Sequence, residues 1–515
     1  MAFAALAVVL LLAVPAEAII VNAASGSFVN VSSAVASAPA GSTVLIPPGT
    51  NVWTQTLNLN NGVSIKGSGT NQTVIIDEES RANNGGQIFI LTGNPIYLTE
   101  LSNLQLCGGV TNTSPNYFGA VVCSVTTATS WRIDHVLFNG LYAKNIATYG
   151  NAFSVIDHNI FLMRAIAIED NGYVDGDQFG DQSYVLPPTY GLNSSNCLYI
   201  EDNFFTNIIG GQAGASDGEN GARVVFRHNT VCNEYFANHG TETGGRSRSE
   251  RSFEIYDNAF NFSPSAPNYP YWTIANIRGG SGVIFSNTVN GYTSIVGLRD
   301  FRSTDAYCGQ WYPFGGATGT NPWDSNSPTL YLSGTSSAPA GSGFLQVAGA
   351  NWAINQWVGY TLVNTNSGYF SPVNSNSVNT MYYLGLGLVQ SHPPMTFNTG
   401  DHFKLYLVYA TLDQPGRGSG DLLVDDGMDA NNNEYVINTS FGVPAYPREA
   451  LEPIYCWSNT LNGVLTGMAS PYPNIQTGRD FYNNTPKPGY AQFAYPHPLT
   501  IYHLAPPTGL QIASP

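Results

Sequence analysis

A short phrase recurs between residues 131 and 289, and it constrains the fold more than any other feature of this sequence. Each copy has an alternating apolar run, a polar pair, usually an asparagine, and a second apolar pair. The copies are Trp131–Phe138, Val155–Phe161, Tyr199–Phe205, Val225–Val231, Phe253–Phe260 and Val283–Val289. The asparagines of the phrase are Asn159, Asn203, Asn229, Asn258 and Asn287, at spacings of 44, 26, 29 and 29 residues. The unit is therefore constant, whereas the joining loops vary in length.

A repeat of this length predicts a repeat architecture. The units hold short β-branched and aromatic runs that alternate with period two, which is typical of strands, and helical periodicity is nowhere sustained. A coil of stacked rungs explains the asparagine in two ways. Asparagine tolerates left-handed backbone dihedrals at a tight bend, and stacked asparagines can hydrogen-bond to one another along the axis. We therefore expect an all-β solenoid.

The phrase resembles the "HNxF"-type repeat of right-handed parallel β-helix proteins of the pectate-lyase-like superfamily. The resemblance covers residues 25–300 and returns near Glu452–Gly463, where Asn459 occupies one more position of the column. A short helix expected at Ser32–Ala38, followed by Gly41–Gly49, is similar to the opening of many β-helix enzymes. The resemblance implies a right-handed parallel β-helix and leaves the substrate open.

The repeat stops after Asp300. Residues 329–409 have a different sequence pattern, in which predicted strands are separated by Asn, Ser and Gly turns. This pattern predicts an inserted small all-β module. The expected organisation is a signal peptide (1–18), a parallel β-helix (25–302), the inserted module (328–409), a return to the β-helix (410–470) and a C-terminal cap and linker (471–515).

The N-terminus predicts export. An apolar run over residues 2–14 is followed by Pro15-Ala-Glu-Ala18, a small-x-small cleavage site. The run is short for a membrane span, and no later segment is long and apolar enough to be one. We expect a secreted protein, extracellular or periplasmic, without a membrane partner. The six cysteines fit either disulfides or buried thiols.

The net charge of the chain limits which classes of molecule it can bind. The chain has 18 Lys and Arg against 34 Asp and Glu, a net charge of −16. Nucleic acid is excluded as a partner, because phosphate binding needs a basic surface. An acidic polysaccharide is repelled overall unless local arginines or a bound cation invert the field.

The strands that follow the asparagine bends carry polar residues at corresponding places. These are Glu169 or Asp170, His239, Arg278 and Arg299. Outward side chains of neighbouring rungs lie ~4.8 Å apart, the strand spacing. We therefore expect these residues to line a groove wall that matches a sugar chain.

The segment 238–251 concentrates charge in a chain where only 10% of residues are charged. Its Glu242, Arg246 and Arg248 are candidates for binding carboxylates through forked guanidinium bonds. The alternative is a solvated loop whose Arg and Glu side chains pair with each other. Trp272 is a candidate for stacking on a sugar face. His135, His158 and His228 lie beside the asparagines, and we interpret them as structural.

The resemblance favours cleavage of a uronate polysaccharide by β-elimination. This reaction needs a neutralised carboxylate, a base near the C5 proton and a proton donor for the leaving oxygen. We assign His239 as base or acid, Arg278 and Arg299 as partners of the carboxylate or transition state, and Glu169 and Asp170 as ligands of a Ca²⁺ cofactor.

Two other functions stay open at this point. The inserted module and the aromatic loops suit a non-catalytic β-helix that binds glycan or acts as a cell-surface or adhesive module. A glycoside hydrolase fits less well, because the N-T-D and R-I-K motifs of related hydrolases are absent. Whether the chain is an enzyme is therefore undecided by sequence.

Overall fold

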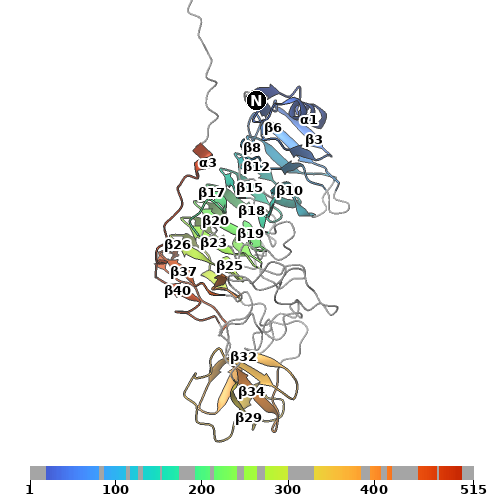
Figure 1. Ribbon diagram of the computed structural model, residues 1–515. Coiled ribbons are helices and arrows are strands. Elements are labelled where there is room, and N and C mark those ends of the chain that lie inside the picture. Colours follow the sequence, from blue (N-terminus) through green and yellow to red (C-terminus); the bar gives the residue numbers. More distant parts are fainter. Residues whose placement is uncertain are drawn as a thin grey trace, which may run out of the picture.

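Three long sheets wind around one axis in the computed structural model, and most rungs place one strand in each sheet (Figure 1). The chain is a right-handed parallel β-helix. The structure describes residues 19–80, 86–111, 116–125, 131–150, 153–172, 192–208, 214–239, 249–263, 273–299, 330–383, 395–406, 414–419, 450–472 and 475–501.

Sheet A carries the alternating run of the repeated phrase. Its neighbouring strands are parallel throughout. In spatial order they are β1 (Ile20–Asn22), β2 (Thr43–Leu45), β5 (Ser64–Lys66), β8 (Thr99–Ser102), β11 (Trp131–Asp134), β14 (Val155–Asp157), β17 (Leu198–Glu201), β20 (Arg223–Arg227), β23 (Ser252–Tyr256), β26 (Ser281–Phe285), β37 (Ile454–Trp457) and β40 (Phe481–Asn483).

Sheet B carries the second apolar pair of the phrase, and its strands follow those of sheet A after a tight bend. They are β3 (Gly49–Trp53), β6 (Thr73–Asp77), β9 (Gln105–Gly108), β12 (Leu137–Asn139), β15 (Ile160–Met163), β18 (Phe204–Asn207), β21 (Thr230–Cys232), β24 (Ala259–Asn261), β27 (Thr288–Asn290), β38 (Thr460–Leu461) and β39 (Val464–Leu465).

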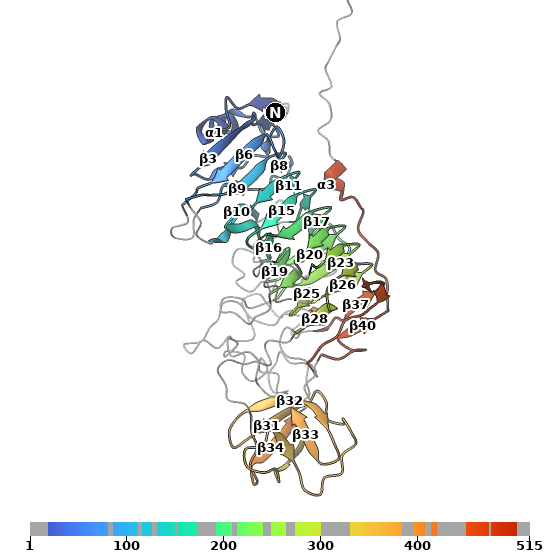
Figure 2. The same ribbon diagram turned by 180° about the vertical axis from the view of Figure 1, so that it is seen from behind.

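Sheet C completes all but the last rungs of the coil, and the candidate site residues lie on its strands or just past their ends. Its strands are β4 (Leu57–Leu59), β7 (Phe89–Leu91), β10 (Asn116–Val125), β13 (Ala143–Gly150), β16 (Ile168–Asn171), β19 (Ser216–Glu219), β22 (Phe236–Asn238), β25 (Thr273–Ile277) and β28 (Ser294–Leu298). Figure 2 shows the coil from behind.

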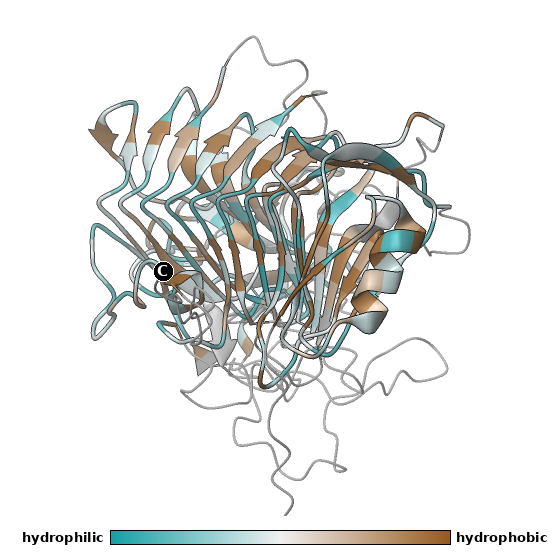
Figure 3. Ribbon diagram, turned by 90° about the horizontal axis from the view of Figure 1, so that it is seen from above, coloured by the Kyte–Doolittle hydropathy of each residue, from teal (hydrophilic) through white to brown (hydrophobic). Residues whose placement is uncertain are grey.

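The core lies inside the coil, where the strands turn apolar side chains inward. Hydrophobic positions, in brown, recur along the strands in Figure 3. On sheet B the rings of Phe138, Phe161 and Phe205 stack, with successive ring centroids 4.7 Å apart. That distance is close to the strand spacing, so equivalent residues of successive rungs pack directly on one another. The core is therefore built from columns of like side chains.

A column of asparagines binds the rungs together at the bend between sheets A and B. The backbone N–H of Asn203 donates to Asn229 Oδ1 at 2.9 Å, and Asn203 Nδ2 donates to the same oxygen at 3.1 Å. Asn203 Nδ2 also donates to the Ile156 carbonyl of the preceding rung at 2.8 Å. The same contacts join Asn159 to Asn203, Asn229 to Asn258, Asn258 to Asn287 and Asn287 to Asn459.

The left-handed residue of the bend is not the asparagine but the residue before it. That part of our explanation of the repeat was wrong. The positive φ angles belong to His135 (50°), His158 (54°), Asp202 (56°), His228 (55°), Asp257 (54°), Ser286 (54°) and Ser458 (55°). Short polar side chains and histidine tolerate this conformation better than most residues, which explains the histidine that precedes several of the asparagines.

A helix closes the first rung. Helix α1 (Phe28–Ser37) begins earlier than the expected Ser32–Ala38, because Ser27 Oγ accepts the Asn30 N–H and caps the helix. Its buried face includes Val31, and Phe28 packs edge-to-face on Trp53 with ring centroids 5.4 Å apart. The helix covers apolar surface that has no lower rung to cover it.

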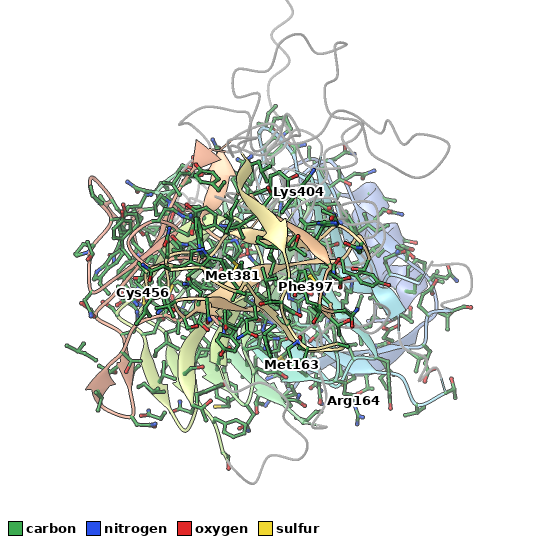
Figure 4. The ribbon with its side chains drawn as sticks, turned by 90° about the horizontal axis from the view of Figure 1, so that it is seen from below. Met163, Arg164, Met381, Phe397, Lys404 and Cys456 are labelled. Atoms are coloured by element: carbon green, nitrogen blue, oxygen red, sulfur yellow. The ribbon has the colours of Figure 1, made fainter. Side chains whose placement is uncertain are left out.

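The inserted module has its own core, which includes Leu362, Met381, Phe397 and Phe403; Met381 and Phe397 are labelled in Figure 4. Its strands form one antiparallel sheet in the order β29 (Leu330–Thr335), β34 (His402–Tyr406), β31 (Thr361–Asn364), β32 (Phe370–Asn376), β33 (Thr380–Tyr383) and β30 (Phe344–Gln346). Strand β32 was not expected, because a proline and several Asn and Ser residues give it the composition of a turn.

The chain rejoins the coil after the module. A two-stranded pair, β35 (Arg417–Ser419) with β36 (Ala450–Leu451), precedes β37. Strand β40 adds one more strand to sheet A within the segment expected to be cap and linker. The chain then runs back along the outer face of sheet A to helix α3 (Pro498–Ile501) (Figure 1). We name residues 486–501 the strap.

A fully buried arginine fastens the strap to the coil. Arg227 Nε donates to Glu201 Oε2 at 2.7 Å, and Arg227 Nη1 donates to the hydroxyl of Tyr256 at 2.9 Å. The same guanidinium donates to the carbonyls of Phe493 at 3.0 Å and Ala494 at 2.8 Å. The charge is therefore neutralised by the coil, and its remaining N–H groups hold the strap.

Two further observations bear on the sequence expectations. Cys107, Cys123, Cys197, Cys232 and Cys456 are free thiols, whereas Cys308 lies outside the described residues. No helix in the described part of the chain is long and apolar enough to cross a membrane.

The asparagine column predicts a stability effect. Asn229→Ala removes a buried donor and acceptor from the column, so we expect a loss of about 1–3 kcal/mol in the free energy of unfolding. Chemical denaturation measures it. Asn290→Ala is the matched control, because Asn290 is exposed and bonds one neighbouring asparagine on sheet B; equal losses in both variants would contradict the role of the column.

The strap predicts a loss of stability in acid. Burial, with help from nearby Arg227, lowers the pKa of His497 from 6.5 to about 4, and its Nδ1 accepts the Leu499 N–H at 3.2 Å. Because the folded pKa is lowered, this stability is present above pH 6.5 and is lost as the pH falls toward 4.

Between pH 7 and pH 5 we expect the free energy of unfolding of the wild type to fall because His497 titrates. In His497→Gln, which has no titrating side chain there, this fall should be smaller by about 2 kcal/mol. Denaturation midpoints at the two pH values test this. Parallel losses in the wild type and the variant would show that His497 is not the titrating group.

Candidate functional site

The outer face of sheet C brings residues of successive rungs into two columns. The strand register pairs Ala147 with Glu169, Glu169 with Asp217, Asp217 with Ala237, Ala237 with Asn276 and Asn276 with Gly297. Two residues further along the strands, the second column contains Asn171, Glu219, His239, Arg278 and Arg299. We name this surface the sheet C face.

His239 and Asp217 form the central pair of the sheet C face. His239 Nδ1 lies 2.7 Å from the Asp217 carboxylate, on the adjacent strand. The Asp217 side chain is 3% exposed and that of His239 is 21% exposed. Because an ionised carboxylate only accepts hydrogen bonds, Nδ1 carries the proton and the lone pair of a neutral ring lies on Nε2. Asp217 therefore orients the imidazole.

Two arginines follow His239 on the next two rungs. Ala237 pairs with Asn276 and Ile277 with Leu298, so the register places His239, Arg278 and Arg299 at corresponding positions past the ends of β22, β25 and β28. The structure thus brings the three residues predicted to be catalytic onto neighbouring rungs. Successive rungs are ~4.8 Å apart, so the three residues follow one another along the axis at the strand spacing.

Asn238 links the strand ends that carry His239 and Arg278. Its Oδ1 accepts the backbone N–H of Arg278 at 2.6 Å, and its Nδ2 donates to the Gly279 carbonyl at 3.1 Å. The regular pairing of β22 with β25 ends at Ala237. The buried Asn238 side chain therefore replaces the backbone ladder where it stops.

Glu169 and Asp170, the predicted cation ligands, lie in different surroundings. The Glu169 carboxylate is ion-paired with Lys144 Nζ on the preceding rung. Asp170 occupies the intervening position, is 4% exposed and accepts the hydroxyl proton of Thr148. Burial raises the pKa of Asp170 to about 7, although the bond from Thr148 and the backbone of Arg223 oppose the shift. Asp170 is thus not on the sheet C face.

Both predicted calcium ligands have partners within the protein, Lys144 for Glu169 and Thr148 for Asp170. Ca²⁺ takes six to eight oxygen ligands, whereas Glu169 is occupied by Lys144 and Asp217 by His239. In the described ranges no group of three or more His, Cys, Asp or Glu side chains is placed to hold a metal ion. The expectation of a Ca²⁺ cofactor at Glu169 and Asp170 stays a prediction.

The remaining predicted binding residues cannot be placed. Glu242, Arg246, Arg248 and Trp272 lie outside the described residues. The structure adds Lys144, Asp217 and Asn276 to the sheet C face. Asp217 was missed because β19 reads Ser-Asp-Gly-Glu, a sequence without apolar alternation, and only the spacing of the rungs on either side points to a strand there.

Comparison with known proteins finds solved structures with a weakly similar fold. No known sequence family matches the chain, and no curated protein matches its sequence. An alginate lyase from Paenibacillus sp. FPU-7 has a TM-score of 0.31 and 13% identity, over 52% of this chain and 94% of that one.

A mutant of the PL6 family alginate lyase AlyGC has a TM-score of 0.28 and 13% identity, over 54% of this chain and 40% of that one. ORF18 of Geobacillus virus E2 has a TM-score of 0.26 and 12% identity, over 55% and 57%. Likenesses this weak do not define an activity, so the function is argued from the sheet C face alone.

The environment of Asp170 predicts an opposite pH effect to that of the strap. Because its folded pKa is raised, its contribution to stability is present below pH 3.8 and is lost as the pH rises through about 7. Between pH 5 and pH 8 we expect the free energy of unfolding of the wild type to fall by roughly 3 kcal/mol more than that of Asp170→Asn, at about 1.4 kcal/mol per pKa unit. Asp257→Asn, at an exposed bend, is the control; a constant difference between wild type and Asp170→Asn would show that Asp170 is ionised throughout.

Proposed function

We propose that this protein is a secreted polysaccharide lyase that cleaves an acidic, uronate-containing chain by β-elimination on the sheet C face. The observation that carries the proposal is the Asp217–His239 pair with Arg278 and Arg299 on the next two rungs. It combines an oriented imidazole with two permanent cations in a chain of net charge −16. A uronate unit needs both, a base for its C5 proton and a cation for its carboxylate.

Each residue has a defined part in the proposed reaction. Arg278 and Arg299 bind the uronate carboxylate, which stabilises the charge that develops when C5 loses its proton. His239 Nε2 takes that proton, the electron pair forms the C4–C5 double bond, and the C4–O4 bond breaks. The imidazolium of His239 then gives its proton to the departing oxygen. Asp217 stabilises the imidazolium while it exists.

Local charge supports this substrate class. The net charge of the whole chain repels a polyuronate, but Arg278 and Arg299 place two permanent cations on neighbouring rungs, and Lys144 offsets Glu169. A local field of this kind draws an anionic chain to one face. The apolar run at 2–14 and the Ala16–Ala18 site support export to where such polysaccharides occur. The repeated phrase supports a place in the pectate-lyase-like superfamily.

The test is incubation with polyuronates, among them polygalacturonate and alginate, while the ultraviolet absorbance of the unsaturated product is followed. We expect the wild type to produce it and His239→Ala to reduce turnover by roughly 10²–10⁴-fold, the scale of lost acid–base catalysis.

The control is His135→Asn, which changes a half-exposed histidine at the bend between sheets A and B. Asparagine tolerates the left-handed backbone there, so we expect full activity. Full activity in His239→Ala would contradict the assigned base. Binding of polyuronate without unsaturated product would replace the lyase with a glycan-binding protein.

A further inference from the structure

Two histidines stack on each other at the bend between sheets A and B, away from the sheet C face. The ring centroids of His135 and His158 are 5.2 Å apart, and the ring planes are 7° from parallel. Both side chains are half-exposed, at 52% for His135 and 47% for His158. Two imidazoles on successive rungs are therefore accessible to solvent side by side.

The bend accepts histidine but does not require it. At the same place in later rungs the left-handed residue is Asp202, Asp257 or Ser286, and short polar side chains tolerate this conformation as well. The backbone thus permits the imidazoles of His135 and His158 without using them.

Each imidazole is oriented by the carboxylate of the preceding residue. His135 Nδ1 lies 2.6 Å from Asp134 Oδ2, and His158 Nδ1 lies 2.8 Å from Asp157 Oδ2. Both carboxylates are buried. Because an ionised carboxylate only accepts hydrogen bonds, Nδ1 carries the proton in each ring and the lone pair of the neutral ring lies on Nε2. A carboxylate bonded to the other ring nitrogen is the partner that a metal-binding histidine usually has.

Negative charge surrounds the two rings. Arg132 Nε and Nη2 donate to the two oxygens of Asp157 at 2.8 and 2.6 Å. Burial opposes its ionisation, but the bonds from Arg132 and His158 lower the pKa of Asp157. The bond to Asp157 raises the pKa of His158, and the charge of Asp202 on the next rung adds to this shift. The carboxylates of Asp134, Asp157 and Asp202 outnumber the one guanidinium, so the local field attracts cations.

We propose that His135 and His158 bind one divalent transition-metal ion through their Nε2 atoms, with water as the remaining ligands. Imidazole is a ligand of Zn²⁺, Ni²⁺ and Cu²⁺, of which Cu²⁺ binds most tightly. In the described ranges no group of three or more His, Cys, Asp or Glu side chains is placed to hold a metal ion, so the protein supplies two ligands. This site goes beyond the proposed lyase and does not depend on it.

The stacking distance is close to what the ion needs. Metal–nitrogen bonds of about 2.0–2.1 Å hold two nitrogen atoms at most ~4 Å apart, whereas the ring centroids of His135 and His158 are 5.2 Å apart. The rings therefore tilt toward each other about their Nδ1 bonds when the ion binds. Their half-exposed position leaves room for this tilt.

The test is calorimetric titration of the full chain with Cu²⁺ at pH 8. We expect His135→Asn and His158→Asn each to weaken binding by roughly 100-fold or more, because two linked ligands gain this much over one. Asparagine tolerates the left-handed backbone, so both variants should fold. Cu²⁺ should raise the melting temperature of the wild type and have little effect on that of either variant. Electron paramagnetic resonance of the wild-type complex should show two nitrogen ligands.

The control is His402→Asn on the inserted module. His402 is exposed, and its Nδ1 lies 3.4 Å from the hydroxyl of Thr335 rather than beside a buried carboxylate. We expect this variant to bind Cu²⁺ as the wild type does. Unchanged affinity in His135→Asn or His158→Asn, an equal loss in His402→Asn, a single nitrogen ligand in the wild-type spectrum, or no binding to the wild type would each overturn the site.

Discussion

The asparagine column is the contact on which the rest of the molecule depends. A parallel coil has no hairpins to set the register between rungs, so a separate device must fix how each rung lies on the next. Each asparagine bonds both the backbone and the side chain of its neighbour one rung away, from Asn159 to Asn459. The register fixed at this bend also fixes the register of the sheet C strand in the same rung. It therefore determines which outward side chains of sheet C are neighbours.

The sheet C face shows why that register matters for chemistry. Asp217 and His239 come from strands of successive rungs that β20 and β21 separate in sequence, yet they meet at 2.7 Å. A slip of one residue in either strand would turn one of them into the core. The inserted module interrupts the chain after the last described rung of sheet C, and Asn287 still bonds Asn459 across 172 residues of sequence. The column thus tolerates long loops and a whole inserted module.

Much of this architecture is readable from sequence, and the parts that are not have physical causes. Strands such as β20 are visible because alternation is enforced by burial of one face. The left-handed residue of the bend was assigned one position too late, because Asn has the stronger general preference for that conformation while its side chain is needed for the column. Strands β19 and β32 were missed because their residues are set by partners on other rungs or strands, not by local propensity. Lys144 and Asn276 gave no local signal, since only stacking brings them to the sheet C face.

The central claim is that the sheet C face binds an acidic sugar chain along the axis of the coil. A crystal structure of the His239→Ala variant with a bound uronate oligosaccharide tests it most directly. The account predicts that the chain lies across β22, β25 and β28, with a carboxylate on Arg278 or Arg299. An oligosaccharide bound to sheet B or to the inserted module, with the sheet C face unoccupied, would contradict it.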